Sequence, residues 1–179
     1  MRNILIKNVM TPISDYATIK EGQTLFDAFQ ILEAGQASAK QLHRDLIVID
    51  EHNKFKGKVT MIDIFRALEP NYKKFNVTYK NGTLTKDNVL NAIRDFDLWL
   101  EPVKTLCERG AAIKISDVMH LPESHEYVLE EESLETALHQ YVMGVHQPLI
   151  VKKEDQVTGV LRFEKLYEVI REHMTACKI

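Results

Sequence analysis

The chain has 179 residues, of which 45% are hydrophobic and 27% are charged, and its formal net charge is −3. This composition is that of a globular protein with a core of its own, and it excludes a disordered or fibrous chain. The slightly acidic balance argues against a broad surface for nucleic acid or for anionic membranes. Cys107 and Cys177 are the only cysteines, and they form no CxxC pair of the kind used for metal or redox chemistry.

The N-terminal sequence MRNILIKNVM lacks the apolar core of a signal peptide. The sequence also has no run of about 18 apolar residues that could span a membrane. Nucleophile, phosphate-loop and dinucleotide motifs are missing too. We therefore expect a cytoplasmic protein that is not an enzyme and that has no membrane or nucleic-acid partner.

The first predicted helix follows Thr24, a residue type that is common at helix N-caps. Residues 46–50, LIVID, predict a buried strand, and the polar turn after them ends in Gly57. A second strand and a second helix are predicted after this glycine. The first helix has apolar residues at the spacing of one buried face: Leu25, Ala28, Phe29 and Leu32.

Residues 70–112 are predicted as an insertion. Asn81-Gly82 is typical of a type I′ hairpin, and Thr85 is expected to cap an amphipathic helix. Pro102 should kink this helix or start a new one. The apolar face either packs on the rest of the protein or forms a dimer or partner contact. Its residues step by four and three: Val89, Ile93, Phe96, Leu100, Val103 and Cys107.

The second part of the chain repeats the first. Residues 118–141 align without gaps with residues 9–32, and Ser133 takes the N-cap place. A strand at 149–151, LIV, and a turn ending in Gly159 then follow. The last predicted helix has an apolar stripe: Phe163, Leu166, Tyr167, Ile170 and Met174.

Each copy therefore predicts strand–helix–strand–strand–helix, an α/β unit that is too small to bury both faces of its sheet by itself. Two such units packed on each other would solve this problem. We predict an α/β (α+β) fold of two tandem β-α-β-β-α units that form a pseudo-two-fold pair. The expected boundaries are 1–69 for the first unit, 70–112 for a hairpin-plus-helix insertion and 113–179 for the second unit.

Six segments of the sequence carry a resemblance to a known family. VMTP at 9–12, the capped helix and LIVID strand, and GKVTMID at 57–63 together resemble a CBS domain (cystathionine β-synthase domain). DVMHLP at 117–122 and GVLRFEKL at 159–166 are similar to a second, more divergent copy. The resemblance covers most of the chain and implies a CBS pair.

Thr60 and Asp63 lie three residues apart at the predicted start of a helix, so their side chains can face the same cleft. A helix N-terminus suits phosphate, and a carboxylate can accept from both hydroxyls of a ribose. Gly57 would permit a turn with positive φ and a close backbone approach. The spacing alone is equally typical of a helix cap in which Asp63 satisfies the first turn.

The resemblance implies more about these residues. In nucleotide-binding CBS domains, the pattern matched by Gly57, Thr60 and Asp63 binds ribose and phosphate of adenosine ligands. A threonine entering the first strand, here Thr18, often joins them. The adenine would be held around Ile19, Ile47 and Val48. The ligand classes implied are AMP, ADP, ATP, S-adenosylmethionine and NAD.

The second copy has Arg162 in place of Thr60 and Lys165 in place of Asp63. A cation cannot accept hydrogen bonds from ribose hydroxyls, so this second site is expected to be altered. Arg162 and Lys165 either bind phosphates of a ligand held across the pair or pair with nearby glutamates as surface charges. Other phosphate candidates are His43 and Arg44.

The seven histidines do not show metal-site spacing, because His120, His125, His139 and His146 never fall at i, i+4 on one helix. We therefore expect no metal site. Two functions remain: a regulatory sensor of an adenosine-containing ligand, or a nucleotide-free scaffold for dimerisation or protein interaction. The sensor would be a homodimer that passes its state to an unidentified downstream protein.

Overall fold

The computed structural model describes residues 2–37, 44–72, 85–99 and 103–176. The predicted Asn81-Gly82 hairpin and His43 therefore lie outside the described residues. Among the helices of the described chain, none combines the length and apolarity that a membrane crossing requires.

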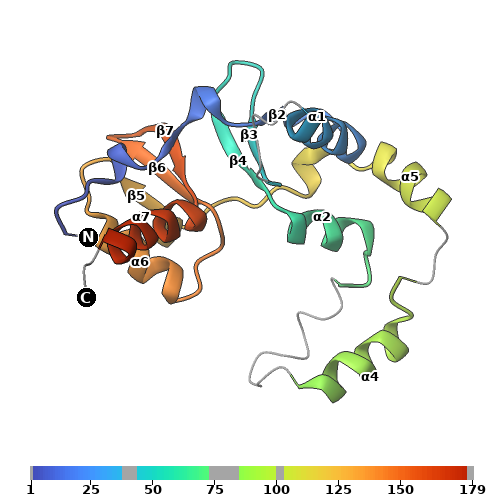
Figure 1. Cartoon of the computed structure of the whole chain (residues 1–179). Coiled ribbons are helices and arrows are strands. Elements are labelled where there is room, and N and C mark those ends of the chain that lie inside the picture. Colours follow the sequence, from blue (N-terminus) through green and yellow to red (C-terminus); the bar gives the residue numbers. More distant parts are fainter. Residues whose placement is uncertain (1, 38–43, 73–84, 100–102, 177–179) are drawn as a thin grey trace.

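The structure confirms the predicted repeat (Figure 1). After the short strand β1 (Thr11–Pro12), unit 1 consists of β2 (Thr18–Lys20), α1 (Leu25–Ala37), β3 (Leu46–Ile49), β4 (Phe55–Val59) and α2 (Met61–Leu68). Unit 2 consists of β5 (Tyr127–Leu129), α6 (Leu134–Val142), β6 (Leu149–Lys153), β7 (Gln156–Leu161) and α7 (Phe163–Ala176). Helices α4 (Lys86–Phe96) and α5 (Val103–Ala112) lie between the two units in sequence.

Each unit has its own sheet, and β1 joins the sheet of the other unit. The sheets have the orders β2-β3-β4 and β1-β7-β6-β5. In each, a parallel pair (β2 with β3, β5 with β6) is followed by an antiparallel one. Parallel neighbours require a crossover helix, and α1 and α6 supply it.

The helix starts differ between the two units. Thr24 caps α1 by accepting from the Asp27 amide at 3.2 Å. Ser133 stands at the N-cap of α6, but its side chain makes no capping hydrogen bond within the described chain. The N-cap position was therefore predicted correctly in both units, and the capping bond forms only in the first.

The two units exchange their leading segments, residues 4–12 and 113–120. Ile6 is fully buried in the core of unit 2, and Ile115 is fully buried in the core of unit 1. The Leu25 amide donates to the carbonyl of Ile113 at 2.9 Å, and in the other unit the Leu134 amide donates to Ile4 at 2.8 Å. The proposed units 1–69 and 113–179 thus each complete the core of the other.

A third, smaller core joins the two sheets. Its buried members come from both units: Tyr16, Ile47, Ile150 and Val160. Each sheet is covered on one face by the helices of its own unit and on the other face by the second sheet. Neither unit therefore leaves a large apolar sheet face in water.

The predicted inserted helix is two helices, and α4 ends at Phe96, where Asp97 takes a left-handed conformation. As predicted, Thr85 caps α4 by accepting from the Asn88 amide at 3.2 Å. Helix α5 packs on α1, whereas α4 lies apart from both sheets (Figure 1). Val89, Leu90 and Ile93 of α4 are 40–52% exposed. These three side chains of α4 are therefore not covered by the described chain, whereas α5 packs on α1.

Candidate functional site

Thr60 and Asp63 bind each other at the start of α2. The Thr60 hydroxyl donates to Asp63 Oδ2 at 2.6 Å, and the Thr60 amide donates to the same oxygen at 2.9 Å. The Asp63 amide lies 3.5 Å from the Thr60 hydroxyl, which completes a capping box. The other carboxylate oxygen, Oδ1, lies 3.7 Å from Nε2 of His146 in unit 2. Asp63 therefore holds the cap with one oxygen and faces the second unit with the other.

The same box occurs at the start of α1. The Thr24 hydroxyl and amide each donate to Asp27 Oδ2 at 2.8 Å. Two copies of one capping geometry in one chain show that capping accounts for the spacing of Thr60 and Asp63. An argument for a ligand must therefore rest on what surrounds Thr60.

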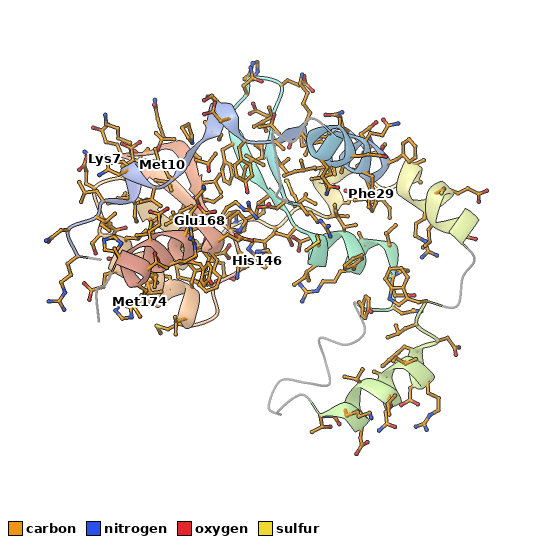
Figure 2. The ribbon with its side chains drawn as sticks, in the orientation of Figure 1. Lys7, Met10, Phe29, His146, Glu168 and Met174 are labelled. Carbon is orange, nitrogen blue, oxygen red and sulfur yellow. The ribbon has the colours of Figure 1, made fainter. Side chains whose placement is uncertain are left out.

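Thr60 lines a cavity of about 500 Å³ that both units share. This volume is within the range of small-molecule sites. In Figure 2, His146 lies between the two lobes of the molecule, and it is one of the lining residues. Unit 1 contributes Arg44, Asp45, Thr60, Met61 and Ile62, and unit 2 contributes Gly144, Val145, His146, Gln147, Pro148, Arg162 and Glu164.

The cavity contains two of the predicted phosphate-binding residues, Arg162 and Arg44. Arg162 comes from unit 2 and lies opposite Thr60 of unit 1, with its Nη2 atom 3.0 Å from Glu164 Oε1. Lys165 does not line this cavity and instead pairs with Glu168 at 2.8 Å. Of the two cations that replace Thr60 and Asp63 in the second copy, only Arg162 is placed for a ligand here.

A second carboxylate is oriented inside the same cavity. Asp45 lines it, and its Oδ2 atom accepts from the Tyr16 hydroxyl at 2.6 Å. Burial raises the pKa of Tyr16 above its usual value, and the neighbouring Asp45 raises it further. Tyr16 therefore stays a neutral donor at physiological pH and holds Asp45 in place.

Thr18 does not share this cavity. It lines a separate one of about 910 Å³, together with Tyr127 and Lys152. The sheet order β2-β3-β4 explains this separation, because Thr18 lies on β2 and Thr60 follows β4, with β3 between them. Among the residues expected around adenine, Ile19 and Val48 are buried in the core of unit 1, and Ile47 is buried between the units. These three side chains offer no surface to a ligand.

The expectation of a positive φ at Gly57 is wrong, whereas the close backbone approach is correct. Gly57 lies inside strand β4. A Cβ atom built on it would lie 2.7 Å from the carbonyl oxygen of His120. This glycine lets the leading segment of unit 2 pack directly on β4.

A buried ion pair lies next to Asp63, and the sequence did not predict it. Lys58 is 0% exposed and Glu126 2%, and Lys58 Nζ lies 2.6 Å from Glu126 Oε2. Lys58 also donates to the carbonyls of His146 at 2.6 Å and Pro148 at 2.8 Å. The ammonium therefore has three acceptors, two of them on the loop that lines the shared cavity.

Two histidines complete this group. Nε2 of His120 lies 2.7 and 2.9 Å from the two oxygens of Glu126. The rings of His120 and His146 stack, with centroids 4.0 Å apart and planes at 17°. The repeat could have revealed the group, because Lys58 aligns with Val160 and Glu126 with Ala17. A polar residue in one copy where the other copy is apolar marks a position with a special role.

The carboxylates of this group remain charged at neutral pH. Burial raises the pKa of Asp63, but hydrogen bonds from His146 and Thr60 outweigh it and hold the pKa below its usual value. Burial likewise opposes charge on Glu126, yet Lys58 and His120 lower its pKa overall. For Lys58, burial lowers the pKa despite the attraction of Glu126.

We expect acid to weaken the fold through Asp63. Because its folded pKa lies below the unfolded value of about 3.9, its stabilisation is complete above that pH and is lost as the pH falls through the folded pKa. Urea unfolding of wild type and Asp63→Asn between pH 7 and pH 2.5 would test this. The variant should lose less stability than wild type below pH 4.5, and parallel curves would contradict the prediction. Thr60 remains the N-cap in this variant, so α2 should persist.

Comparisons with known proteins agree with this architecture. The CBS domain family model matches residues 6–70. A search of curated protein sequences found no match to the chain. Among solved structures, CBSX2 from Arabidopsis thaliana is 17% identical with a TM-score of 0.62, over 97% of this chain and 99% of that one.

Two further structures are similar over most of their length. A CBS domain-containing protein from Bacillus anthracis is 17% identical with a TM-score of 0.62, over 96% of this chain and 95% of that one. The CBS domain of a bacterial CNNM/CorC family Mg²⁺ transporter, solved in complex with ATP, is 16% identical with a TM-score of 0.58, over 95% and 89% of the two chains. CBSX2 has also been solved in complex with AMP. Residues 6–70 are thus a CBS domain, and the chain as a whole has the fold of the CBS-pair proteins.

Proposed function

We propose that this protein is a regulatory module without catalytic activity that binds an adenosine-containing nucleotide in the cavity shared by its two units. The observation that carries the proposal is the position of Arg162, which lies across this cavity from Thr60 at the N-terminus of α2. An arginine and a helix N-terminus that face one space suit a phosphate group. The complexes of CBSX2 with AMP and of the transporter CBS domain with ATP support the ligand class.

The other lining groups fit the remaining parts of a nucleotide. Met61 and Ile62 are 44% and 55% exposed and give the cavity an apolar wall for a base. Asp45 and Thr60 offer oxygen acceptors for ribose hydroxyls or an amino group. Asp63 orients Thr60 through the capping box. A cavity with two arginines and two carboxylates suits a ligand that carries both an anion and hydrogen-bond donors.

Ligand binding between two units can change their relative arrangement only if affinity differs between arrangements. The cavity meets the structural requirement, because its walls come from both units. We propose that the bound nucleotide favours one arrangement and that the partner protein responds to it.

Arg162→Met should weaken nucleotide binding by about 10- to 100-fold, because hydrogen bonds to charged groups contribute about 1.5–3 kcal/mol. Lys165→Met is the matched control and should leave affinity unchanged, since Lys165 lies in the first turn of α7, after Arg162, and pairs with Glu168. Calorimetric titration of AMP, ADP, ATP, S-adenosylmethionine and NAD into each protein would measure this. Equal losses in both variants, or no binding of any ligand by folded wild type, would reject the proposed site.

The duplicate capping box supports a second candidate function, a nucleotide-free scaffold. Thr60 and Asp63 need no ligand to satisfy their hydrogen bonds, just as Thr24 and Asp27 need none. If the protein is such a scaffold, titration should show no nucleotide binding, and the exposed face of α4 would carry the function.

We also propose that this face of α4, Val89, Leu90 and Ile93, forms a homodimer contact. Exposed apolar side chains at helical spacing suit an isologous helix pair. Leu90→Asp should convert a dimer into a monomer in light scattering coupled to size-exclusion chromatography. The control is Asn91→Asp on the same turn. A dimer that survives Leu90→Asp would place the contact elsewhere.

A further inference from the structure

Two imidazoles and one carboxylate converge at the junction of the two units. One ring nitrogen of His120, one of His146 and a carboxylate oxygen of Glu126 all lie within 4.8 Å of one another. We propose that these three residues form a binding site for a divalent transition-metal ion of the zinc type. This inference is independent of the proposed nucleotide site.

The donor set matches the proposed ion. Two imidazole nitrogens and one carboxylate oxygen are a common protein ligand set for zinc, with a fourth position left for water or another ligand. His120 Nε2 and Glu126 Oε1 are already 2.7 Å apart, at hydrogen-bond distance. A metal ion would take the place of the proton in that bond.

The third ligand has to move. Zinc–ligand bonds of about 2.1 Å put neighbouring ligand atoms about 3.4 Å apart in a tetrahedral site. The three ligand atoms lie within 4.8 Å of one another, so a turn of the His146 ring on the order of an ångström would bring its nitrogen to the same ion. Its ring is held by stacking on His120, and its side chain is 23% exposed, which leaves it room to turn.

An unsatisfied ring nitrogen supports the assignment independently. His146 Nδ1 is buried and has no hydrogen-bond partner among the residues that the structure describes. A buried nitrogen without a partner costs free energy, and coordination to a metal would remove that cost. The other nitrogen, Nε2, faces Asp63 at 3.7 Å, and a carboxylate in that position is the usual outer partner of a metal-bound histidine.

The neighbouring charges leave the proposed position open. Lys58 bonds Glu126 through Oε2 at 2.6 Å, whereas Oε1 faces His120 and accepts a longer bond of 3.3 Å from the Glu123 amide. With neutral imidazoles, the formal charges of Lys58, Glu126 and Asp63 sum to −1. The group therefore has an excess negative charge that favours a cation in addition to the buried ammonium.

The site occurs once within the described chain. The pseudo-two-fold counterparts of His120 and Glu126 are Thr11 and Ala17, which cannot replace them as ligands. His146 also lines the shared cavity, and the backbone of His120 pairs with Lys58 of unit 1. A bound ion would therefore act where the two units meet and would restrict a residue of the cavity wall.

Metal titration of the full chain would test the site. After dialysis against a chelator, wild type should bind Zn²⁺ at one equivalent and unfold at a higher temperature with it. Co²⁺ should give the visible absorption of tetrahedral coordination. His120→Ala and His146→Gln should each weaken binding by more than 10-fold and remove the Co²⁺ band. His125→Ala and His139→Ala change exposed histidines outside the group and should leave both unchanged.

Two results would overturn the proposal: no zinc binding by folded wild type, or binding that survives both His120→Ala and His146→Gln. The second would assign the ion to other histidines. If His120→Ala does not fold, the Co²⁺ spectrum of His146→Gln still decides the outcome. Titration of nucleotide into the same variants measures the proposed nucleotide site by itself. Failure of the metal site can then be distinguished from failure of the nucleotide site.

Discussion

Glu126→Leu should destabilise the protein by about 3–5 kcal/mol at pH 7, the range measured when one partner of a buried ion pair is removed. The reason is that Lys58, which is 0% exposed, would lose the carboxylate that it bonds at 2.6 Å. Its two remaining acceptors, the carbonyls of His146 and Pro148, are dipoles and cannot neutralise it. Urea unfolding followed by circular dichroism would measure the loss.

Two further variants make this experiment specific. Lys58→Met/Glu126→Leu removes both charges of the pair, and most of the stability should return, because apolar residues often replace buried pairs without loss. The matched control is Glu131→Leu, which removes an exposed pair with Lys7 at 2.9 Å and should cost less than about 1 kcal/mol. A loss in Glu126→Leu as small as in Glu131→Leu would show that Lys58 finds other compensation.

Gly57→Ala and Gly159→Ala should each lower stability by about 1–3 kcal/mol, as overpacked sites do. The added Cβ would lie 2.7 Å from the carbonyl oxygen of His120 in one variant and of Thr11 in the other. Both contacts are with backbone, so neither can be relieved by a side-chain rotation. The leading segment of the other unit would have to move away from the sheet.

Thermal unfolding would measure this effect, with about 2–4 °C lost per kcal/mol at this chain length. Gly22→Ala is the control, because a Cβ there meets no atom within 4 Å. It should change stability by no more than about 0.5 kcal/mol. If all three variants have the same unfolding midpoint, the two glycines are not required for the docking of the leading segments. In Gly57→Ala/Gly159→Ala the two losses of stability should nearly add, because one contact is with His120 and the other with Thr11, in different leading segments.

The sequence by itself determined the repeat, the order of its elements and the helix starts at Thr24, Thr60 and Thr85. These features depend on interactions within a few residues: a hydroxyl that caps an amide, an apolar spacing that matches one helix face. The close approach at Gly57 was also foreseen, since only a missing side chain admits another backbone. The position of Arg162 opposite Thr60 could be anticipated because a pseudo-two-fold axis relates the two copies.

Only the tertiary structure decided which residues meet at the site. Thr18 and Thr60 were expected in one pocket, but β3 lies between their strands. Lys58 and His146 are 88 residues apart, and no local spacing rule can connect them. The expectation of no metal site came from such a rule, whereas His120 and His146 stack through the packing of two loops. The two histidines meet because the leading segments are exchanged, which places the start of unit 2 against β4 and α2 of unit 1.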